Sequence, residues 1–177
     1  MNRSVLVVNG HPDPRPERFC AALCDAYERG ARAAGNATRR LDVGALQLSA
    51  LVLAEAPGSE PLDAMELAFR LVRAADQLAI FYPLWAGAPP PELHQLFDMV
   101  ARLNAHLHPE PAGDKTANVV VTSGLPALFY RGRPDTRPAL RGVAAGEPLL
   151  IGSVDTISPR LRTRWLEQMQ GRGEKLS

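Results

Sequence analysis

The sequence has 177 residues, the length of one domain that is large enough to bury its own hydrophobic core. Hydrophobic residues make up 46% of it and charged residues 22%, which excludes a disordered or fibrous chain. The formal net charge of +1 is too balanced to attract a nucleic acid over a long range, so we expect no nucleic-acid partner.

Cysteine, histidine and apolar patterns exclude several other classes of protein. Cys20 and Cys24 are too few for a disulfide framework and lie one helical turn apart, so we expect both to pack inward as small apolar residues. The four histidines show no metal-binding spacing, and no apolar stretch approaches the ~20 residues that cross a bilayer. Asn9-Gly10 interrupts the first apolar run too early for a signal peptide, so a reducing cytoplasm is expected.

The first half of the chain alternates between strand and helix patterns. Ser4–Asn9 is a short apolar run that ends at a glycine, as a strand buried on both faces does. A loop with three prolines follows over Gly10–Glu17, and apolar residues at four-residue spacing then predict an amphipathic helix that starts at Phe19. Ala37–Val43 is a weaker strand, and Gly44–Pro61 is expected to be a loop with a short helical turn.

The second half repeats the alternation. Leu62–Ala75 has helical spacing, Gln77–Tyr82 is another buried strand, and Pro83–Pro89 is the loop that follows it. Pro90-Pro91 marks the start of the next helix, because proline suits only the first helical turn. The remaining predicted elements are a fourth strand over Ala117–Thr122, a fifth over Pro148–Val154, and a helix over Pro159–Gln170 capped by Ser158.

This alternation predicts one α/β domain over residues 1–177, a doubly wound parallel sheet with helices on both faces. Five strands with the first near the middle are typical of the flavodoxin-like order 2-1-3-4-5. In such a sheet, ligands bind beyond the carboxyl ends of the first, third and fourth strands. Three loops are therefore candidates for a binding site: Gly10–Arg18, Pro83–Pro89 and Thr122–Tyr130.

The three loops share a character that indicates a flavin-like ligand. In the first loop, His11, Arg15 and Arg18 precede a helix N-terminus, whose free N–H groups suit a phosphate. In the second, Trp85 and Gly87 suit a flat aromatic ring. The third offers a polar turn that a ligand can approach closely. A phosphate at one end and a planar ring at the other describe a flavin mononucleotide-like molecule.

Other sites and folds leave no comparable signal. The sequence contains no G-x-G-x-x-G fingerprint after the first strand, no P-loop and no G-x-S-x-G elbow. A phosphoacceptor receiver domain needs acidic residues after the first and third strands, where this chain has Asn9-Gly10-His11 and Tyr82-Pro83. We therefore exclude that reading.

Four segments resemble one known family, the flavodoxin-like NAD(P)H:quinone oxidoreductases of the DT-diaphorase type. Val7–Cys20 resembles the first loop of that family, and Ala75–Val100 its second loop and the following helix. Thr122–Tyr130 is similar to its third loop, and Ile151–Glu167 to its C-terminal strand and helix. The most specific piece is Tyr82-Pro83-Leu84-Trp85 followed by Gly87 and Pro90.

The resemblance implies a flavin-dependent NAD(P)H oxidoreductase. A bound FMN or FAD would accept hydride from NAD(P)H and pass two electrons to a quinone-like acceptor in a ping-pong cycle, with Tyr130 facing the ring and the acceptor as the catalytic residue. The loops and the resemblance together indicate the cofactor-binding residues His11, Arg18, Phe19, Pro83, Leu84, Trp85, Ala86, Gly87, Thr122, Ser123 and Gly124. A homodimer is also implied, and Leu96 and Phe97 are candidates for its exposed apolar surface.

Departures from the family pattern favour an alternative function. Arg18 and Cys20 stand where the family usually has serine and asparagine, Ala86 stands where a second aromatic is common, and the segment after Tyr130 is shorter. These changes would suit a non-catalytic ancillary subunit that regulates a partner such as a potassium efflux system.

Two of the candidate residues also have structural alternatives. Arg18 could pair with Glu17 or Glu28 at the surface instead of contacting a phosphate. Trp85 could be an anchor of the hydrophobic core instead of lining a ligand site.

Overall fold

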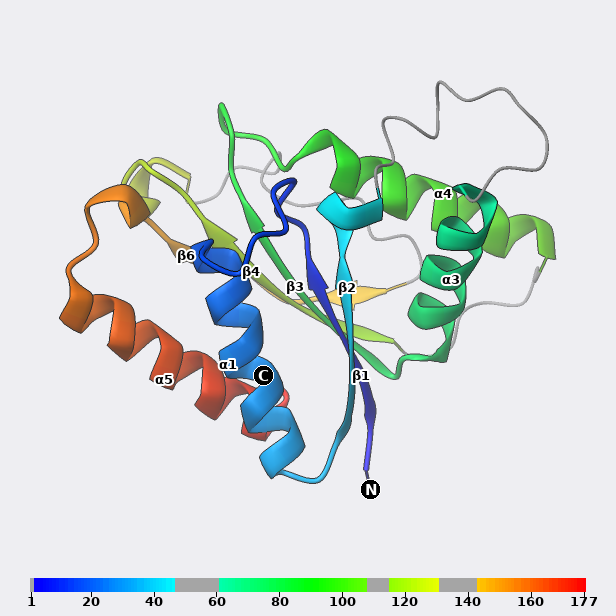
Figure 1. Ribbon diagram of the computed structural model, residues 1–177, viewed down its shortest axis with the longest axis horizontal. Helices are drawn as coiled ribbons and strands as arrows, with labels where there is room; N and C mark the ends of the chain where they lie inside the picture. The colour runs from blue at the N-terminus through cyan, green and yellow to red at the C-terminus, as the bar shows by residue number, and fades with distance from the viewer. Residues whose placement is uncertain (1, 47–60, 108–114, 131–142) are drawn as a thin grey trace.

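The computed structural model describes residues 2–46, 61–107, 115–130 and 143–177, in which a parallel sheet lies between two helical layers (Figure 1). The strands are β1 (Ser4–Asn9), β2 (Ala37–Asp42), β3 (Gln77–Pro83), β4 (Thr116–Thr122), β5 (Ala144–Ala145) and β6 (Leu149–Ile151). The helices are α1 (Phe19–Ala33), α3 (Pro61–Ala74), α4 (Pro91–Leu107) and α5 (Pro159–Lys175). The 3₁₀ turns are η1 (Val43–Leu46), η2 (Ala127–Tyr130) and η4 (Val154–Thr156).

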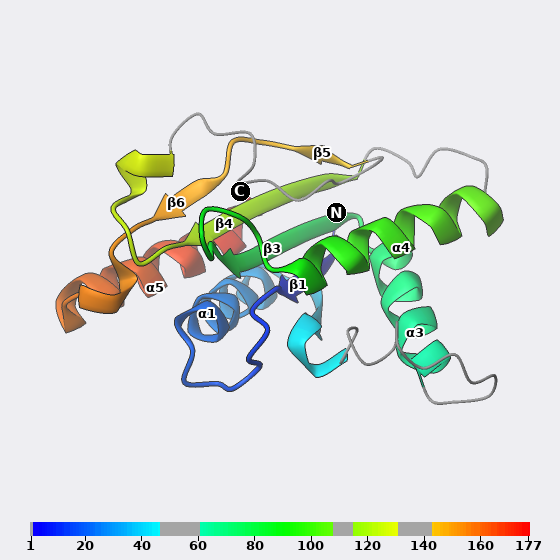
Figure 2. The ribbon, with the colours of Figure 1, turned by 90° about the horizontal axis from the view of Figure 1, so that it is seen from above.

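The sheet has the strand order β2-β1-β3-β4-β5, and every pair is parallel, which confirms the predicted doubly wound order. The outer edge differs from the prediction. Instead of one strand over Pro148–Val154, β5 pairs with the start of β4 and β6 pairs with its end, in line along the same edge (Figure 2). Pro148 has no N–H to donate to β4, which explains why the ladder is interrupted there.

Alternate side chains of the central strands enter two separate hydrophobic cores. Val5 and Val7 of β1 face the layer of α1 and α5, whereas Leu6 and Val8 face the layer of α3 and α4. Figure 1 shows these two helix pairs on opposite sides of the sheet. Strands buried on both faces read as continuous apolar runs, which is why β1 and β3 were recognisable from the sequence.

The apolar residues that the sequence nominated for a dimer surface belong to the core instead. Leu96 is fully buried and Phe97 is 5% exposed, and both pack with Leu93 and Val100 of α4 in the core that α3 and α4 share with the sheet. Their side chains are therefore not available to a second subunit. The prediction that Leu96 and Phe97 are exposed was wrong, because the sheet and α3 together cover the apolar face of α4.

Helices α1 and α5 cross so closely that two glycines are required. A Cβ on Gly30 would lie 1.9 Å from the backbone oxygen of Gln170, and a Cβ on Gly173 would lie 2.1 Å from that of Tyr27. Met169 and Tyr27 are buried beside the crossing. The same contact explains why α5 continues to Lys175 rather than ending at Gln170 as predicted.

The start of α5 matches the sequence pattern. Ser158 occupies the N-cap position, its Oγ accepts a hydrogen bond of 3.3 Å from the N–H of Leu161, and Pro159 is the first helical residue. Cys20 and Cys24 of α1 are both buried free thiols, as expected.

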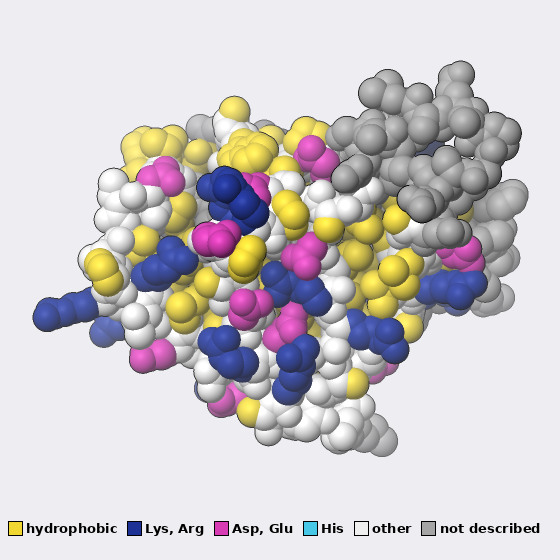
Figure 3. All heavy atoms as spheres, viewed as in Figure 1, with side chains coloured by type: hydrophobic (Ala, Val, Ile, Leu, Met, Phe, Trp, Pro, Cys, Tyr) yellow, Lys and Arg dark blue, Asp and Glu magenta, His cyan; other side chains and the backbone are white. Residues whose placement is uncertain are grey.

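The described helices include none that combines the length and apolar character needed to cross a bilayer. Arginine and acidic side chains are interspersed over the face shown in Figure 3 and do not form a single basic field there.

Candidate functional site

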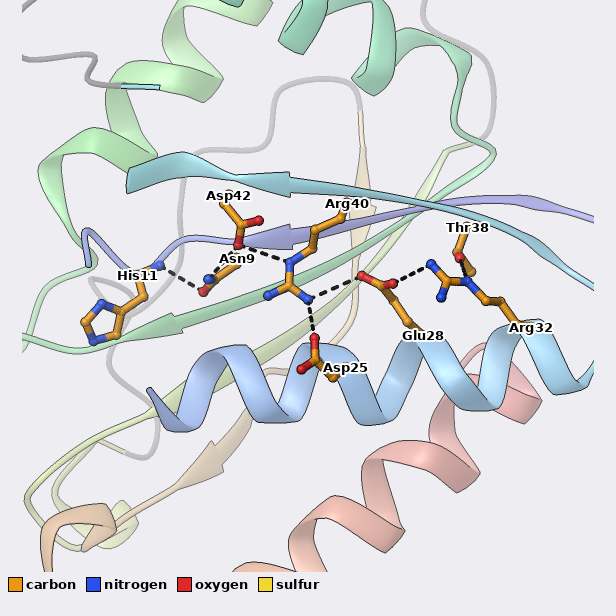
Figure 4. A network of polar contacts seen from close by, with 8 residues as sticks. All are labelled: Asn9, His11, Asp25, Glu28, Arg32, Thr38, Arg40 and Asp42. Atoms are coloured by element: carbon orange, nitrogen blue, oxygen red, sulfur yellow. Dashed lines mark hydrogen bonds and ion pairs between the residues drawn. The ribbon is translucent and has the colours of Figure 1, made fainter. Parts of the chain in front are cut away.

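The first loop begins at a buried asparagine at the carboxyl end of β1. Asn9 donates through Nδ2 to Oδ1 of Asp42 at 2.8 Å, and its Oδ1 accepts a hydrogen bond of 3.3 Å from the backbone N–H of His11. Figure 4 shows that Arg40 extends this network, with its guanidinium between Asp42 and the carboxylates of α1. The loop therefore starts from a position that β1 and β2 hold together.

A glycine on η1 determines how closely the first loop packs. A Cβ on Gly44 would lie 2.1 Å from the carbonyl oxygen of Pro12, so a side chain there would displace the loop backbone. The same Cβ would lie 2.9 Å from the backbone oxygen of His11, a contact between segments distant in the chain that the local sequence pattern does not reveal.

Asp13 binds the two arginines of the first loop. Its carboxylate accepts hydrogen bonds from Nε and Nη2 of Arg15, at 2.9 and 2.6 Å, and from Nε of Arg18 at 2.7 Å. Nη2 of Arg18 also donates to Asp13. We call these three residues the arginine clasp. The alternative partners named for Arg18 were wrong, because Glu28 pairs instead with Arg32 and Arg40.

His11 is a neutral ring whose tautomer is set by the same loop. The backbone N–H of Asp13 donates to Nδ1 of His11 at 2.9 Å, so the neutral imidazole carries its proton on Nε2. Burial, followed by the nearby charge of Arg18, lowers the pKa of His11 from its usual 6.5. The ring thus stays neutral at pH 7.

The second loop is a tight two-residue turn that leaves a tryptophan exposed. Trp85 and Ala88 exchange two backbone hydrogen bonds of 3.0 Å, and the residues between them, Ala86 and Gly87, have φ values of 50° and 86°. Trp85 is 51% exposed and meets the ring of His11 edge-on, with 5.8 Å between centroids. This exposure rules out the core-anchor alternative for Trp85.

The third loop is polar and internally hydrogen-bonded. Ser123 donates through Oγ to the carbonyl oxygen of Leu125 at 2.6 Å, and Thr122 Oγ1 shares a hydrogen bond of 3.3 Å with Cys20 Sγ. Burial raises the pKa of Cys20 to about 11, so this side chain is a protonated thiol at neutral pH. The contact between Cys20 of α1 and Thr122 of β4 is therefore uncharged.

A cavity of about 490 Å³ lies among the three loops, a size within the range of small-molecule and cofactor sites. The predicted residues that line it are His11, Arg18, Phe19, Pro83, Leu84, Trp85, Thr122, Ser123 and Gly124. Ala86 and Gly87 form the turn that carries Trp85 and do not line the cavity. The structure thus brings together side chains from three loops that are far apart in the sequence.

Tyr130 is not among the residues that line this cavity. It is only 8% exposed, belongs to the core that contains Leu84, and its Cε1 lies 3.7 Å from the position that a Cβ on Gly87 would take. It therefore packs beneath the tryptophan turn. Residues 131–142, most of the shortened segment after Tyr130, lie outside the described residues.

The family follows from a match over most of the chain. A family model described as "Flavodoxin-like fold" matches residues 3–144. The chain belongs to the flavodoxin-like fold family. No curated protein matches the sequence.

Solved structures with this flavodoxin-like fold are similar over the whole chain at low sequence identity. An NAD(P)H:quinone oxidoreductase from Methanothermobacter marburgensis superposes with a TM-score of 0.74 at 20% identity, covering 100% of this chain and 97% of that one. An FMN-dependent NADH-azoreductase from Bacillus anthracis, in complex with FMN, superposes with a TM-score of 0.63 at 11% identity, covering 99% of each chain.

Several residues of this flavodoxin-like cavity were missed by the sequence analysis. Pro12, Asp13, Cys20, Val154 and Asp155 also line it. Asp155 comes from η4, beyond the fifth-strand edge, and its Oδ2 would lie 2.4 Å from a Cβ on Gly124. The switch-point rule names only the loops after the first, third and fourth strands, so nothing in that rule pointed to η4.

A resident metal site has no support among the residues that the structure describes, where no three His, Cys, Asp or Glu side chains gather closely enough to hold an ion.

Proposed function

We propose that this chain is a flavin-dependent oxidoreductase that takes hydride from NAD(P)H and delivers it to a quinone-like acceptor. The observation that carries the proposal is the cavity, which joins an arginine-bearing helix N-terminus to a half-exposed tryptophan. A flavin would supply the hydride-accepting and hydride-donating ring when bound. The protein residues would bind and orient that ring.

The phosphate of such a cofactor fits the N-terminus of α1. Arg18 stands at the N-cap position without a side-chain cap hydrogen bond, and the first turn contains no acidic residue. The first N–H groups of a helix have no partner within the helix and face a positive dipole end, which favours an anion. Arg15 and Arg18 add charged donors beside them.

The ring of the cofactor fits the other end of the cavity. Trp85 presents a large exposed aromatic surface, and Pro83 and Leu84 extend the apolar wall beside it. Beside this wall, where Thr122 pairs with Pro83, the residues Thr122, Ser123 and Gly124 form the polar end of β4. An aromatic and apolar wall next to a polar turn suits a planar ring with a hydrogen-bonding edge.

FMN is the flavin that we favour, and the structurally similar azoreductase in complex with FMN supports this choice. The similar NAD(P)H:quinone oxidoreductase supports a quinone-like acceptor. Because donor and acceptor would use the same cavity in turn, we propose a ping-pong cycle. The buried free thiols of Cys20 and Cys24 suit a reducing compartment, and we place the protein in the cytoplasm.

A homodimer remains part of the proposal, now through a different surface. Leu125, Leu128 and Phe129 of the third loop are 54%, 74% and 60% exposed, and Trp85 is exposed on the neighbouring loop. Exposed apolar residues gathered at the rim of a site are typical of an interface. A second copy seated there would enclose the acceptor. Sedimentation at assay concentration tests this, and a monomer would contradict it.

From the family resemblance, we propose that Tyr130, which packs beneath the turn that carries Trp85, assists the acceptor. Tyr130→Phe removes the hydroxyl and keeps the ring that packs under Gly87, so flavin affinity and folding should stay unchanged. The acceptor half-reaction should slow by roughly tenfold or more if the hydroxyl stabilises developing charge. Stopped-flow measurement of both half-reactions checks this. Unaltered half-reactions would leave Tyr130 with a packing role.

The proposed function is tested by titrating the protein with FMN and riboflavin while flavin fluorescence is followed. Saturable quenching is expected at micromolar protein, followed by bleaching with NADH or NADPH and reoxidation by a simple quinone. Parallel initial-rate lines are expected for the two substrates. A protein that binds no flavin would contradict the proposal, whereas flavin binding without turnover would favour the ancillary-subunit alternative.

A further inference from the structure

Asp13 is the acidic side chain that faces the cavity from within the proposed phosphate site. It lines the cavity together with Arg18, and its carboxylate takes up donors of both Arg15 and Arg18. Arg15 contributes a two-point pair, from Nε to Oδ1 and from Nη2 to Oδ2, the arrangement with which arginine also binds phosphate. The donors that a phosphate would need are thus already bound to a carboxylate of the same loop.

We propose that Asp13 determines specificity in this site: it competes with the phosphate group for the arginine clasp and so lowers the preference for a phosphorylated flavin over an unphosphorylated one. The inference rests on the proposed flavin function and deepens it. FMN and riboflavin differ only in the phosphate, so the ratio of their affinities isolates this contribution.

The charge of Asp13 makes the competition direct. The hydrogen bonds from Arg15 and Arg18 hold the pKa of Asp13 far below its usual range, so the carboxylate stays ionised throughout the pH range of an assay. A phosphate that enters must either displace this anion from the arginines or lie beside it. Both arrangements weaken phosphate binding relative to a clasp whose arginines are free.

The geometry allows the exchange without repacking the core. The side chains of Arg15 and Arg18 are 66% and 43% exposed, and their partner Asp13 is two and five residues away in the same loop. The backbone of Asp13 is tied to Nδ1 of His11. Only side-chain rotations are therefore needed to transfer the two guanidinium groups from the carboxylate to a ligand.

The test compares Kd values for FMN and riboflavin in the wild type, Asp13→Asn and Asp13→Glu, by isothermal titration at pH 7 and low salt. Asp13→Asn should bind FMN at least about fivefold more tightly, while its riboflavin Kd stays within about twofold of the wild-type value. Asp13→Glu restores the competing charge and should keep the wild-type ratio. Inorganic phosphate should compete with FMN more strongly in Asp13→Asn than in the wild type.

A control variant separates competition from general charge. Glu17→Gln removes an exposed carboxylate of the first loop that does not line the cavity. It should leave the ratio of the FMN and riboflavin Kd values within about twofold of the wild-type ratio. A thermal melt confirms that each variant is folded at the titration temperature.

The outcomes distinguish this inference from the function on which it rests. A wild type that binds both flavins, with an unchanged or reduced ratio in Asp13→Asn, would overturn the role of Asp13 and leave the proposed function in place. An equal gain in FMN affinity in Glu17→Gln would also overturn it. A wild type that binds neither flavin would overturn both.

Discussion

The crossing of α1 with α5 and the rim of the cavity are built in contrasting ways. At the crossing, Gly30 and Gly173 bring two helix backbones into direct contact, and the neighbouring Tyr27 and Met169 are completely shielded from solvent. At the rim, by contrast, Trp85 is half exposed, and charged and apolar side chains of the loops face outward.

This contrast separates folding from binding. Close-packed backbones cannot adjust to an added atom, so changes at the crossing should appear in the free energy of unfolding. Exposed rim side chains contribute little burial in the free protein and remain available to a ligand. Changes there should appear in affinity. Substitutions in the two regions should therefore differ in the property that they change.

The largest effect on stability is expected from Gly173→Ala. The added Cβ would meet the backbone oxygen of Tyr27 at 2.1 Å, and a helix backbone cannot move away cheaply. We expect a loss of at least about 2 kcal/mol in the free energy of unfolding, measured by urea denaturation. Gly171→Ala is the matched control on the same helix, because a Cβ there meets nothing within 4 Å. It should stabilise by about 0.5–1 kcal/mol. Equal effects of the two changes would show that the crossing is looser than described.

The second prediction compares the two tryptophans of the chain. Trp85→Ala should weaken flavin binding by about 1–3 kcal/mol. The free energy of unfolding should stay within about 0.5 kcal/mol of the wild-type value, because the ring is half exposed. Trp165 packs against the core between the sheet and α1. Trp165→Ala should lower stability and preserve the flavin Kd. Fluorescence titration and thermal melts measure both properties, and a Trp85→Ala protein with intact affinity would remove Trp85 from the site.

A smaller effect is expected at the turn that carries Trp85. Ala86 has a φ of 50°, in the left-handed region that disfavours a residue with a Cβ. Ala86→Gly should therefore stabilise the protein by up to about 1 kcal/mol, since relief of the strain is partly offset by greater freedom of the unfolded chain. Gly87, at a φ of 86°, should respond in the opposite direction when changed to Ala. Thermal melts measure the change in stability of both variants. A loss of stability in Ala86→Gly would contradict the assigned turn.

The smallest effect is a pH dependence from His11. Its pKa in the folded protein is below 6.5, so between the two values the unfolded chain binds more protons than the folded one. Stability should therefore fall as the pH is lowered from about 6.5 towards the folded-state pKa, where protonation also removes the Nδ1 acceptor of the Asp13 N–H. His11→Gln should flatten this part of the profile, measured by urea denaturation at several pH values. A slope unaffected by the substitution would assign it to other groups.

Local patterns predicted the secondary structure and the three loops that line the cavity. Buried runs such as Ser4–Asn9 predicted the strands, and Ser158-Pro159 predicted the start of α5, because these signals depend on neighbours in the chain. Alternation of strands and helices then sufficed for the sheet order and for the three loops that surround the cavity.

Only the tertiary structure decided which residues those patterns bring into contact. The clasp of Asp13 on Arg15 and Arg18, the exposure of Trp85 and the burial of Leu96 depend on side-chain directions and on segments distant in the chain. Asp155 enters the cavity from beyond the outer edge of the sheet, and α5 extends past its predicted end because Gly173 packs on α1. Periodicity identifies which face of an element is apolar, whereas packing against other elements determines what that face meets.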